Sequence, residues 1–253
     1  MQGRQIPVVL SGIAGERACN PLLASVRASA YVRVMPPTGP RRGKYLGFVA
    51  HEIKNPLATA LWSCDLLKRM EQGDRAGPRA EKMIDASLRA LRRIRRLVDD
   101  YFTIERLQEH GYELRSEPVE VRQLVEAAVS QLAEKDGIPT EHWTIDVPAQ
   151  AQATGDVDML KRAVRLLLEH LGRAPDVKIA IVGKSGGAAA QLALRADPAP
   201  SPLVPPPPEE RPSGDPNGSV LGYALAEAIL ASHGGTVEER DGGLVVTFPA
   251  AAR

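Results

Sequence analysis

The sequence is short of several residue types that define whole classes of protein. Of its 253 residues only two are cysteine, Cys19 and Cys64, and they lie far apart, outside any CxxC spacing. This excludes a disulfide framework and a cysteine-ligated zinc cluster, and it is typical of a reducing compartment. Aromatic residues make up only 4% of the chain, so aliphatic side chains have to fill its core.

Long apolar runs and an excess of charge of one sign are also missing. No apolar segment approaches the roughly 20 residues that a membrane-spanning helix needs. The apolar stretch at residues 6–10 is too short for a signal-peptide core. The formal net charge is +1, which gives no reason to expect a nucleic acid or a membrane surface as partner. We therefore expect a cytoplasmic protein with no nucleic-acid and no membrane partner.

The chain divides into three parts by pattern. Residues 1–40 hold two strand-like stretches and are expected to be a leader or a remnant that resembles part of a receiver domain. Residues 41–110 contain two helical segments, separated by a glycine- and proline-containing break at residues 72–78. Residues 111–253 alternate strands and helices and include a proline-rich stretch at residues 198–217. The predicted fold class is α+β.

The third part gives a detailed pattern of elements. Helices are expected at residues 121–133, 157–171 and 221–232. Strands are expected at residues 113–119, 143–147, 177–182, 188–196, 236–240 and 244–248. Together they predict an α/β sandwich that follows the helical hairpin.

Both helical segments of the hairpin carry a stripe of apolar residues at steps of three and four. The first stripe runs from Leu46 to Leu67 and the second from Ala80 to Tyr101. A narrow stripe is the pattern of a helix packed in a bundle, and two helices bury little surface by themselves. We therefore expect a homodimer in which two hairpins form a four-helix bundle.

His51 lies on the opposite side of the first helix from this stripe. With 100° per residue and Val49 as origin, the stripe spans roughly 0° to 80°, whereas His51 falls at about 200° and Asn55 at about 240°. Both side chains should face outward, one turn apart. The adjoining Glu52 can orient or deprotonate the imidazole. The alternative is a solvated surface histidine, which this geometry alone does not exclude.

The motif around this histidine is specific. Residues 51–57, His-Glu-Ile-Lys-Asn-Pro-Leu, closely resemble the phosphoacceptor box of sensor histidine kinases, and residues 48–50 resemble its usual lead-in. The resemblance implies His51 as phosphoacceptor, Glu52 as its acid/base partner, and Asn55 as the residue that aligns water or a receiver domain for phosphoryl removal. It also implies a dimeric hairpin. A zinc-protease motif is excluded, because position 55 is not histidine.

The resemblance extends into the third part of the chain. In this family a Bergerat-type ATP-binding domain follows the hairpin, and residues 111–253 are similar to it in order. The similarity places His170 at the magnesium-holding asparagine and Asp197 at the adenine-reading aspartate. It places Gly218 and Gly222 in the phosphate loop.

Several of these nucleotide positions depart from the family pattern. His170 and Leu166 stand where oxygen ligands for magnesium are expected. Prolines replace the glycines after Asp197, and Val220 replaces a phosphate-loop glycine, where a Cβ obstructs the approach of phosphate. The proline-rich stretch at residues 198–217 stands where the family has its mobile ATP lid, or it is a plain linker. We expect a degenerate site with no cofactor and no metal, the alternative being a divergent site that binds ATP and magnesium.

The predicted function is phosphotransfer in two-component signal transduction. His51 is expected to exchange a phosphoryl group with the aspartate of a response-regulator receiver domain, as in a phosphorelay. One alternative is an ATP-dependent sensor histidine kinase, and another is a non-catalytic pseudokinase dimer that regulates a partner. A basic run on the second helix is either a solvated face or a docking surface for an acidic receiver; it consists of Arg89, Arg92, Arg93, Arg95 and Arg96.

Overall fold

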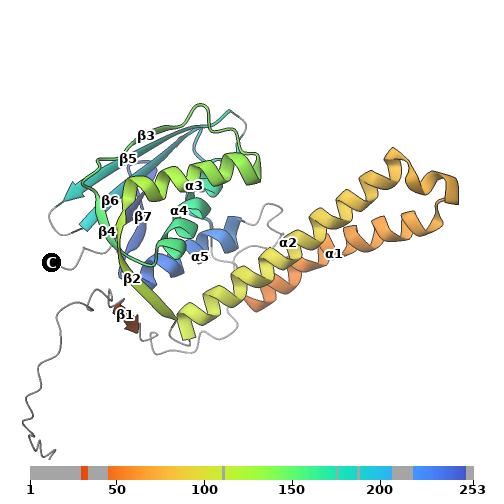
Figure 1. Ribbon diagram of the computed structural model, residues 1–253, viewed down its shortest axis with the longest axis horizontal. Coiled ribbons are helices and arrows are strands. Elements are labelled where there is room, and N and C mark those ends of the chain that lie inside the picture. The colour runs from red at the N-terminus through yellow and green to blue at the C-terminus, as the bar shows by residue number, and fades with distance from the viewer. Residues whose placement is uncertain are drawn as a thin grey trace, which may run out of the picture.

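In the computed structural model a long helical hairpin projects from an α/β body (Figure 1). The structure describes residues 30–33, 45–109, 112–174, 176–186, 189–206 and 219–248. The predicted α+β fold class is confirmed. Most of residues 1–40, and residues 207–218 of the proline-rich stretch, lie outside the described residues.

The hairpin consists of two long helices. Helix α1 (Leu46–Arg69) and helix α2 (Pro78–Glu109) are joined by a short 3-10 helix (Gln72–Ala76). Arg75 closes the end of α1: its Nε donates to the carbonyl of Met70 at 3.1 Å and its Nη2 to that of Lys68 at 3.0 Å. Helix α2 begins at proline, which lacks only an N–H that the first turn leaves unbonded. The predicted break therefore forms a capped turn between antiparallel helices.

Eight strands are described, in two sheets. The larger sheet has the order β3-β5-β6-β8-β7, with β3 (Thr144–Asp146) parallel to β5 (Lys178–Gly186) and the other pairs antiparallel. Its remaining strands are β6 (Ala189–Asp197), β7 (Thr236–Arg240) and β8 (Gly243–Thr247). The smaller sheet has the order β1-β2-β4 and comprises β1 (Ala30–Arg33), β2 (Glu113–Glu120) and β4 (Gln152–Gly155).

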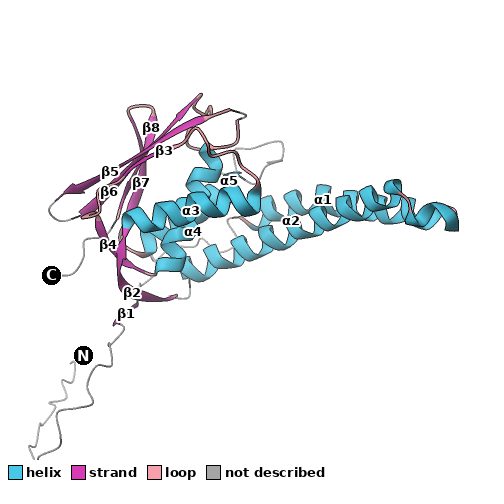
Figure 2. Cartoon of the chain, turned by 45° about the horizontal axis from the view of Figure 1, so that its top comes forward, coloured by secondary structure: helices cyan, strands magenta, loops and turns pink. Residues whose placement is uncertain are grey.

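Three helices cover one face of the larger sheet: α3 (Val121–Asp136), α4 (Val157–Leu171) and α5 (Ser219–Ser232) (Figure 2). Asp156 caps the start of helix α4: its Oδ1 accepts from the backbone N–H groups of Asp158 and Met159 at 3.1 and 3.2 Å. Helix α3 ends at Gly137, whose φ of 65° is the left-handed value that glycine adopts without strain.

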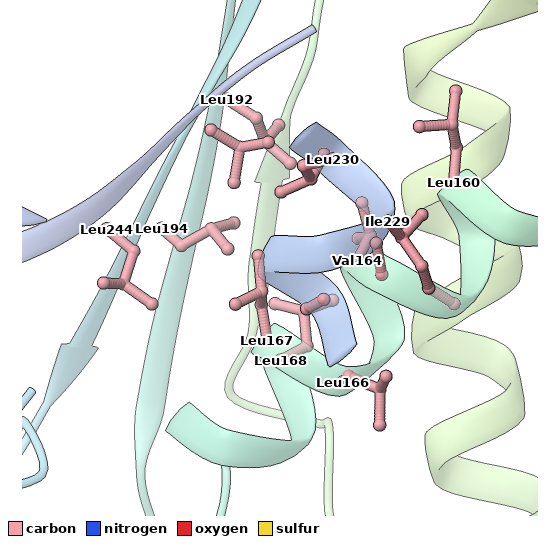
Figure 3. Close-up of a cluster of buried hydrophobic side chains, with 14 of the residues drawn as sticks. Leu160, Val164, Leu166, Leu167, Leu168, Leu192, Leu194, Ile229, Leu230 and Leu244 are labelled. Atoms are coloured by element: carbon pink, nitrogen blue, oxygen red, sulfur yellow. The ribbon is translucent and has the colours of Figure 1, made fainter. Parts of the chain in front are cut away.

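Aliphatic side chains fill the core between these helices and the larger sheet, as the scarcity of aromatic residues requires. In the close-up, leucines of α4 and α5 face leucines of β6 and β8 (Figure 3). The fully buried members with no exposed surface include Leu160, Leu167, Leu168, Leu192, Leu194, Ile229, Leu230 and Leu244. This core is continuous with buried residues of the hairpin, among them Leu97, Ile104 and Leu107 of α2.

Ion pairs join the hairpin to this body. Asp100 of α2 accepts from Arg162 Nη2 of α4 at 2.5 Å, and Arg96 lies 3.6 Å from a carboxylate oxygen of Glu169. Burial raises the pKa of Asp100, although the Arg162 guanidinium acts in the opposite direction. Helix α2 thus packs against α5 and is joined to α4 by ion pairs, while the loop end of the hairpin extends away from the body (Figure 1).

Candidate functional site

The structure places His51 on the outer side of α1, with 56% of its side chain exposed. Asn55, one turn further along the same helix, is also exposed. The residues that α1 buries lie on another side of the helix; they are Val49, Glu52, Pro56, Ala60 and Ser63. The imidazole is therefore accessible to a protein partner and has no packing role within the chain.

Glu52 is buried directly beside this exposed histidine. Its side chain is 3% exposed, and its Oε1 lies 3.5 Å from Nδ1 of His51. Its other oxygen, Oε2, accepts from Nη2 of Arg93 on α2 at 3.3 Å. A carboxylate out of contact with water needs such a partner, because burying an unpaired charge is costly. His51, Glu52 and Arg93 thus form a connected row that crosses from α1 to α2.

A groove of about 590 Å³ lies between the two helices at this point. Its floor and sides combine amide, hydroxyl and guanidinium groups with small apolar residues. The groove is lined by Glu52, Asn55, Pro56 and Thr59 of α1 and by Ala86, Arg89, Ala90 and Arg93 of α2. Two arginines therefore face the space beside the phosphoacceptor motif.

The opposite face of the hairpin is apolar and exposed. Around the axis of each helix, the residues of this face lie about 100° to 180° from the residues that line the groove. Its large side chains are each between 42% and 60% exposed in the single chain: Leu46, Leu57 and Leu61 on α1, and Ile84, Leu88 and Leu91 on α2. The predicted stripe therefore contains two sets of residues, one packed between α1 and α2 and one facing outward.

His170, at the predicted magnesium position, is engaged by the protein itself. It is 6% exposed, and its Nε2 lies 2.8 Å from the carbonyl oxygen of Leu203. Its ring also meets Tyr223 edge to face, with 5.8 Å between the ring centroids. Leu203 belongs to the start of the proline-rich stretch and is 7% exposed. This segment therefore packs over the end of α4.

Two of the other predicted nucleotide residues lie on described elements, Gly222 on α5 and Asp197 on β6. Gly222 is buried within α5, where an added Cβ would lie 3.4 Å from Leu166 Cδ2. Asp197 is exposed at the end of β6, and Gly218 lies outside the described residues. Val220 is 3% exposed. In the part of the chain that the structure describes, no group of three or more His, Cys, Asp or Glu residues could hold a metal ion.

Arg93 is the functional residue that sequence reasoning did not single out. The sequence shows the basic run on α2, but the run alone does not say which arginine turns toward α1.

Among the described residues, no helix is long and apolar enough to cross a membrane.

Comparison with known proteins agrees with this arrangement. Residues 41–110 match the family model of the His Kinase A (phospho-acceptor) domain. Among curated protein sequences, none matches the chain.

Three solved structures share the fold at low sequence identity. The Acinetobacter baumannii histidine kinase AdeS is 14% identical, with 80% of this chain and 98% of that chain covered and a TM-score of 0.59. ThkA, a histidine kinase solved in complex with the response regulator TrrA, is 18% identical, with 83% and 62% covered and a TM-score of 0.59. Full-length ShkA, solved with AMPPNP, is 16% identical, with 83% and 47% covered and a TM-score of 0.51.

These structures support the fold alone, and the family assignment comes from the phosphoacceptor segment. That segment contains His51, Glu52 and Asn55 in the arrangement described above. Residues 41–110 therefore form a His Kinase A (phospho-acceptor) domain, and the α/β body that follows it shares its fold with solved histidine kinases.

Proposed function

We propose that the protein is a cytoplasmic phosphotransfer dimer of two-component signalling, in which His51 exchanges a phosphoryl group with an aspartate of a response-regulator receiver domain. The observation that carries the proposal is the exposed imidazole backed by the buried, Arg93-paired carboxylate of Glu52. Residues 41–110 would be the dimerisation and phosphoacceptor part, and residues 111–253 a catalytic-domain scaffold.

The chemistry follows from the two ring nitrogens of His51. Nδ1 faces Glu52, so an Nδ1–H group can donate a hydrogen bond to the carboxylate, and in that tautomer Nε2 carries the lone pair. Nε2 attacks the phosphorus of an aspartyl phosphate, a P–N bond forms, the acyl P–O bond breaks, and the receiver carboxylate departs. The reverse reaction returns the phosphoryl group to the receiver. Asn55, exposed one turn away, would align water or the receiver when the phosphoryl group is removed.

The two faces of the hairpin suit two protein partners. The groove, with Arg89 and Arg93, presents positive charge to an acidic receiver beside His51. The apolar face with Leu57 and Leu91 would be covered by a second copy of the chain, because exposed leucines at helical spacing are what a four-helix bundle buries. The complex of ThkA with a response regulator is an example of such a partner among its structural neighbours.

The residues at the nucleotide positions do not fit ATP with magnesium. The imidazole of His170 is committed to Leu203 and is a poorer magnesium ligand than an oxygen donor. Val220 adds a buried Cβ where a backbone N–H would approach phosphate. We therefore derive no step through ATP. The second candidate function, an ATP-dependent histidine kinase, is favoured by the α/β fold shared with ShkA, which was solved with AMPPNP.

A labelled-transfer assay tests the proposal. Offered a panel of phosphorylated receiver domains, the wild-type protein should acquire acid-labile, base-stable label. His51→Ala should abolish labelling without loss of helical structure, because the side chain is exposed. His142→Ala, at another exposed histidine, is the matched control and should label normally. Labelling by ATP instead of receivers would support the kinase, and labelling by neither would leave a pseudokinase.

A further inference from the structure

Arg93 differs from the other arginines of the basic run in what its guanidinium contacts. Its side chain is 33% exposed, and Nη2 points at Oε2 of the buried Glu52 at 3.3 Å. The same carboxylate presents Oε1 to Nδ1 of His51 at 3.5 Å. Arg93 is thus linked to the phosphoacceptor through Glu52, across the contact between the two helices.

We propose that Arg93 is a positioning residue for phosphotransfer, which holds the Glu52 carboxylate aimed at Nδ1 of His51 so that the imidazole keeps its proton on Nδ1 and presents an unprotonated Nε2. The proposal rests on the proposed function of His51. In this arrangement the carboxylate of Glu52 orients the imidazole of His51, and the guanidinium of Arg93 orients that carboxylate.

The electrostatics of the site support this role. A carboxylate that is 3% exposed is costly unless a charged partner compensates it. The charged groups that line the space around Glu52 are His51 on its own helix, and Arg93 and Arg89 on α2. Arg93 contacts Oε2, while Oε1 lies 3.5 Å from Nδ1 of His51. As the P–N bond forms, the imidazole gains positive charge, which the adjacent carboxylate stabilises.

Transfer rates give the first test. Arg93→Gln should slow phosphoryl transfer from a receiver by about 10- to 100-fold, the usual loss when an orienting partner is removed, and Arg93→Lys should restore part of the rate. Arg89→Gln is the matched control, since Arg89 lines the same groove one turn away; it should lose less than Arg93→Gln. In a Glu52→Gln background, Arg93→Gln should cause little further loss, because the two residues act as one unit.

The tautomer of His51 gives a second test that needs no receiver. Nitrogen-15 NMR at about pH 8, where a free imidazole is neutral, distinguishes a proton on Nδ1 from one on Nε2. The wild-type spectrum should show His51 enriched in the Nδ1–H form, and Arg93→Gln should shift it toward Nε2–H. Arg89→Gln should leave it unchanged.

The two readouts separate the possible failures. An unchanged tautomer in Arg93→Gln overturns the positioning role, even where transfer slows, since Arg93 would then act on the phosphoryl group or the receiver. If no receiver labels the wild-type protein, the phosphotransfer function fails, while the tautomer measurement still decides what Arg93 does to His51. Circular dichroism checks folding. Should Arg93→Gln unfold, Arg93→Lys carries the test, with an intermediate tautomer population expected.

Discussion

The hairpin and the α/β body use their apolar residues in opposite ways. Between its own two helices, α1 buries small or polar side chains, among them Glu52, Ala60 and Ser63, while Leu57 and Leu61 remain exposed. In the body the leucines of α4 are turned inward and have almost no exposed surface. The hairpin therefore leaves apolar surface exposed in the single chain, whereas the body turns its leucines into the core.

The two regions also differ in how exposed their predicted site residues are. In the hairpin the motif residues His51 and Asn55 are exposed and available for chemistry. In the body, His170 and Val220 are buried and packed against the chain itself. A fold depends on the pattern of apolar burial and a site on a few polar positions, so the second can change while the first persists.

The largest expected effect contrasts one leucine from each region. Leu167→Ala, at a fully buried position, should lower the free energy of unfolding by about 2–5 kcal/mol, because it removes buried methyl groups and leaves a cavity. Leu91→Glu, at a position 51% exposed in the single chain, should leave the fold intact but dissociate the proposed dimer, since the bundle would bury an unpaired charge. Denaturant unfolding and light scattering measure the two effects.

Each variant serves as the control for the other. Leu167→Ala should remain dimeric wherever it is folded, and Leu91→Glu should keep its helical circular dichroism at concentrations where it is a monomer. A wild-type protein that is monomeric at micromolar concentration, or a Leu91→Glu variant that stays dimeric, would contradict the assignment of the apolar face to a second copy.

The next effect concerns two neighbours of the phosphoacceptor. Glu52→Ala should slow phosphoryl transfer by about 10²-fold or more if the carboxylate acts in acid–base catalysis. Asn55→Ala should affect loss of the phosphoryl group more than its acquisition, because Asn55 is exposed one turn from His51, whereas the carboxylate beside Nδ1 is that of Glu52. Single-turnover labelling and dephosphorylation measure the two rates. If Glu52→Ala and Asn55→Ala slowed acquisition and loss of the phosphoryl group equally, this division of roles would be contradicted.

Much of the fold could be predicted from the sequence because the apolar patterns are strong. The helix at Val157–Leu171 begins and ends as predicted, and the hairpin strands and the two long helices are present. The strand at Gln152–Gly155 was missed because it has four residues and little apolar character. Its position is fixed by antiparallel pairing with β2, a long-range contact that local pattern does not report.

The candidate site was predictable only in part. The outward position of His51 follows from helical periodicity, and the structure agrees. The pairing of Glu52 with Arg93 does not follow from periodicity. The two residues are 41 positions apart, and their contact depends on the register between α1 and α2. The buried face of α1 was predicted only in part: Val49 and Ala60 belong to the predicted stripe, whereas Pro56 and Ser63 give no periodic hydrophobic signal.

A smaller effect is expected at the junction of α4 and α5. His233 Nε2 accepts from the backbone N–H of Asp156 at 3.1 Å and Nδ1 lies 2.7 Å from the carbonyl of Ile229. Burial lowers the pKa of His233 below its ordinary value of 6.5. Below about pH 6.5 the unfolded chain therefore binds more protons at this histidine than the folded protein does. The contribution of His233 to the free energy of unfolding is fully present above that pH, and it is lost as the pH falls toward the lower pKa of the folded state.

Comparison with a variant isolates this contribution. His233→Gln should show a shallower loss of unfolding free energy between about pH 7 and pH 5 than wild type, whereas His142→Gln, at an exposed histidine, should follow the wild-type curve. Urea unfolding across this pH range provides the measurement. Parallel curves for wild type and His233→Gln would show that the junction does not titrate as inferred.

The last prediction is that adding nucleotide has no measurable effect on the protein. In the body, Leu203 and Tyr223 pack against His170, and Val220 is buried at the start of α5. We expect no measurable ATP affinity at millimolar ligand, and no shift in thermal midpoint with ATP and magnesium, because a ligand that does not bind cannot stabilise the folded state. Calorimetry that showed magnesium-dependent binding tighter than about 100 µM, or about −5.5 kcal/mol, would contradict the degenerate site. It would favour the kinase, and the hairpin and the body would then both retain their chemistry.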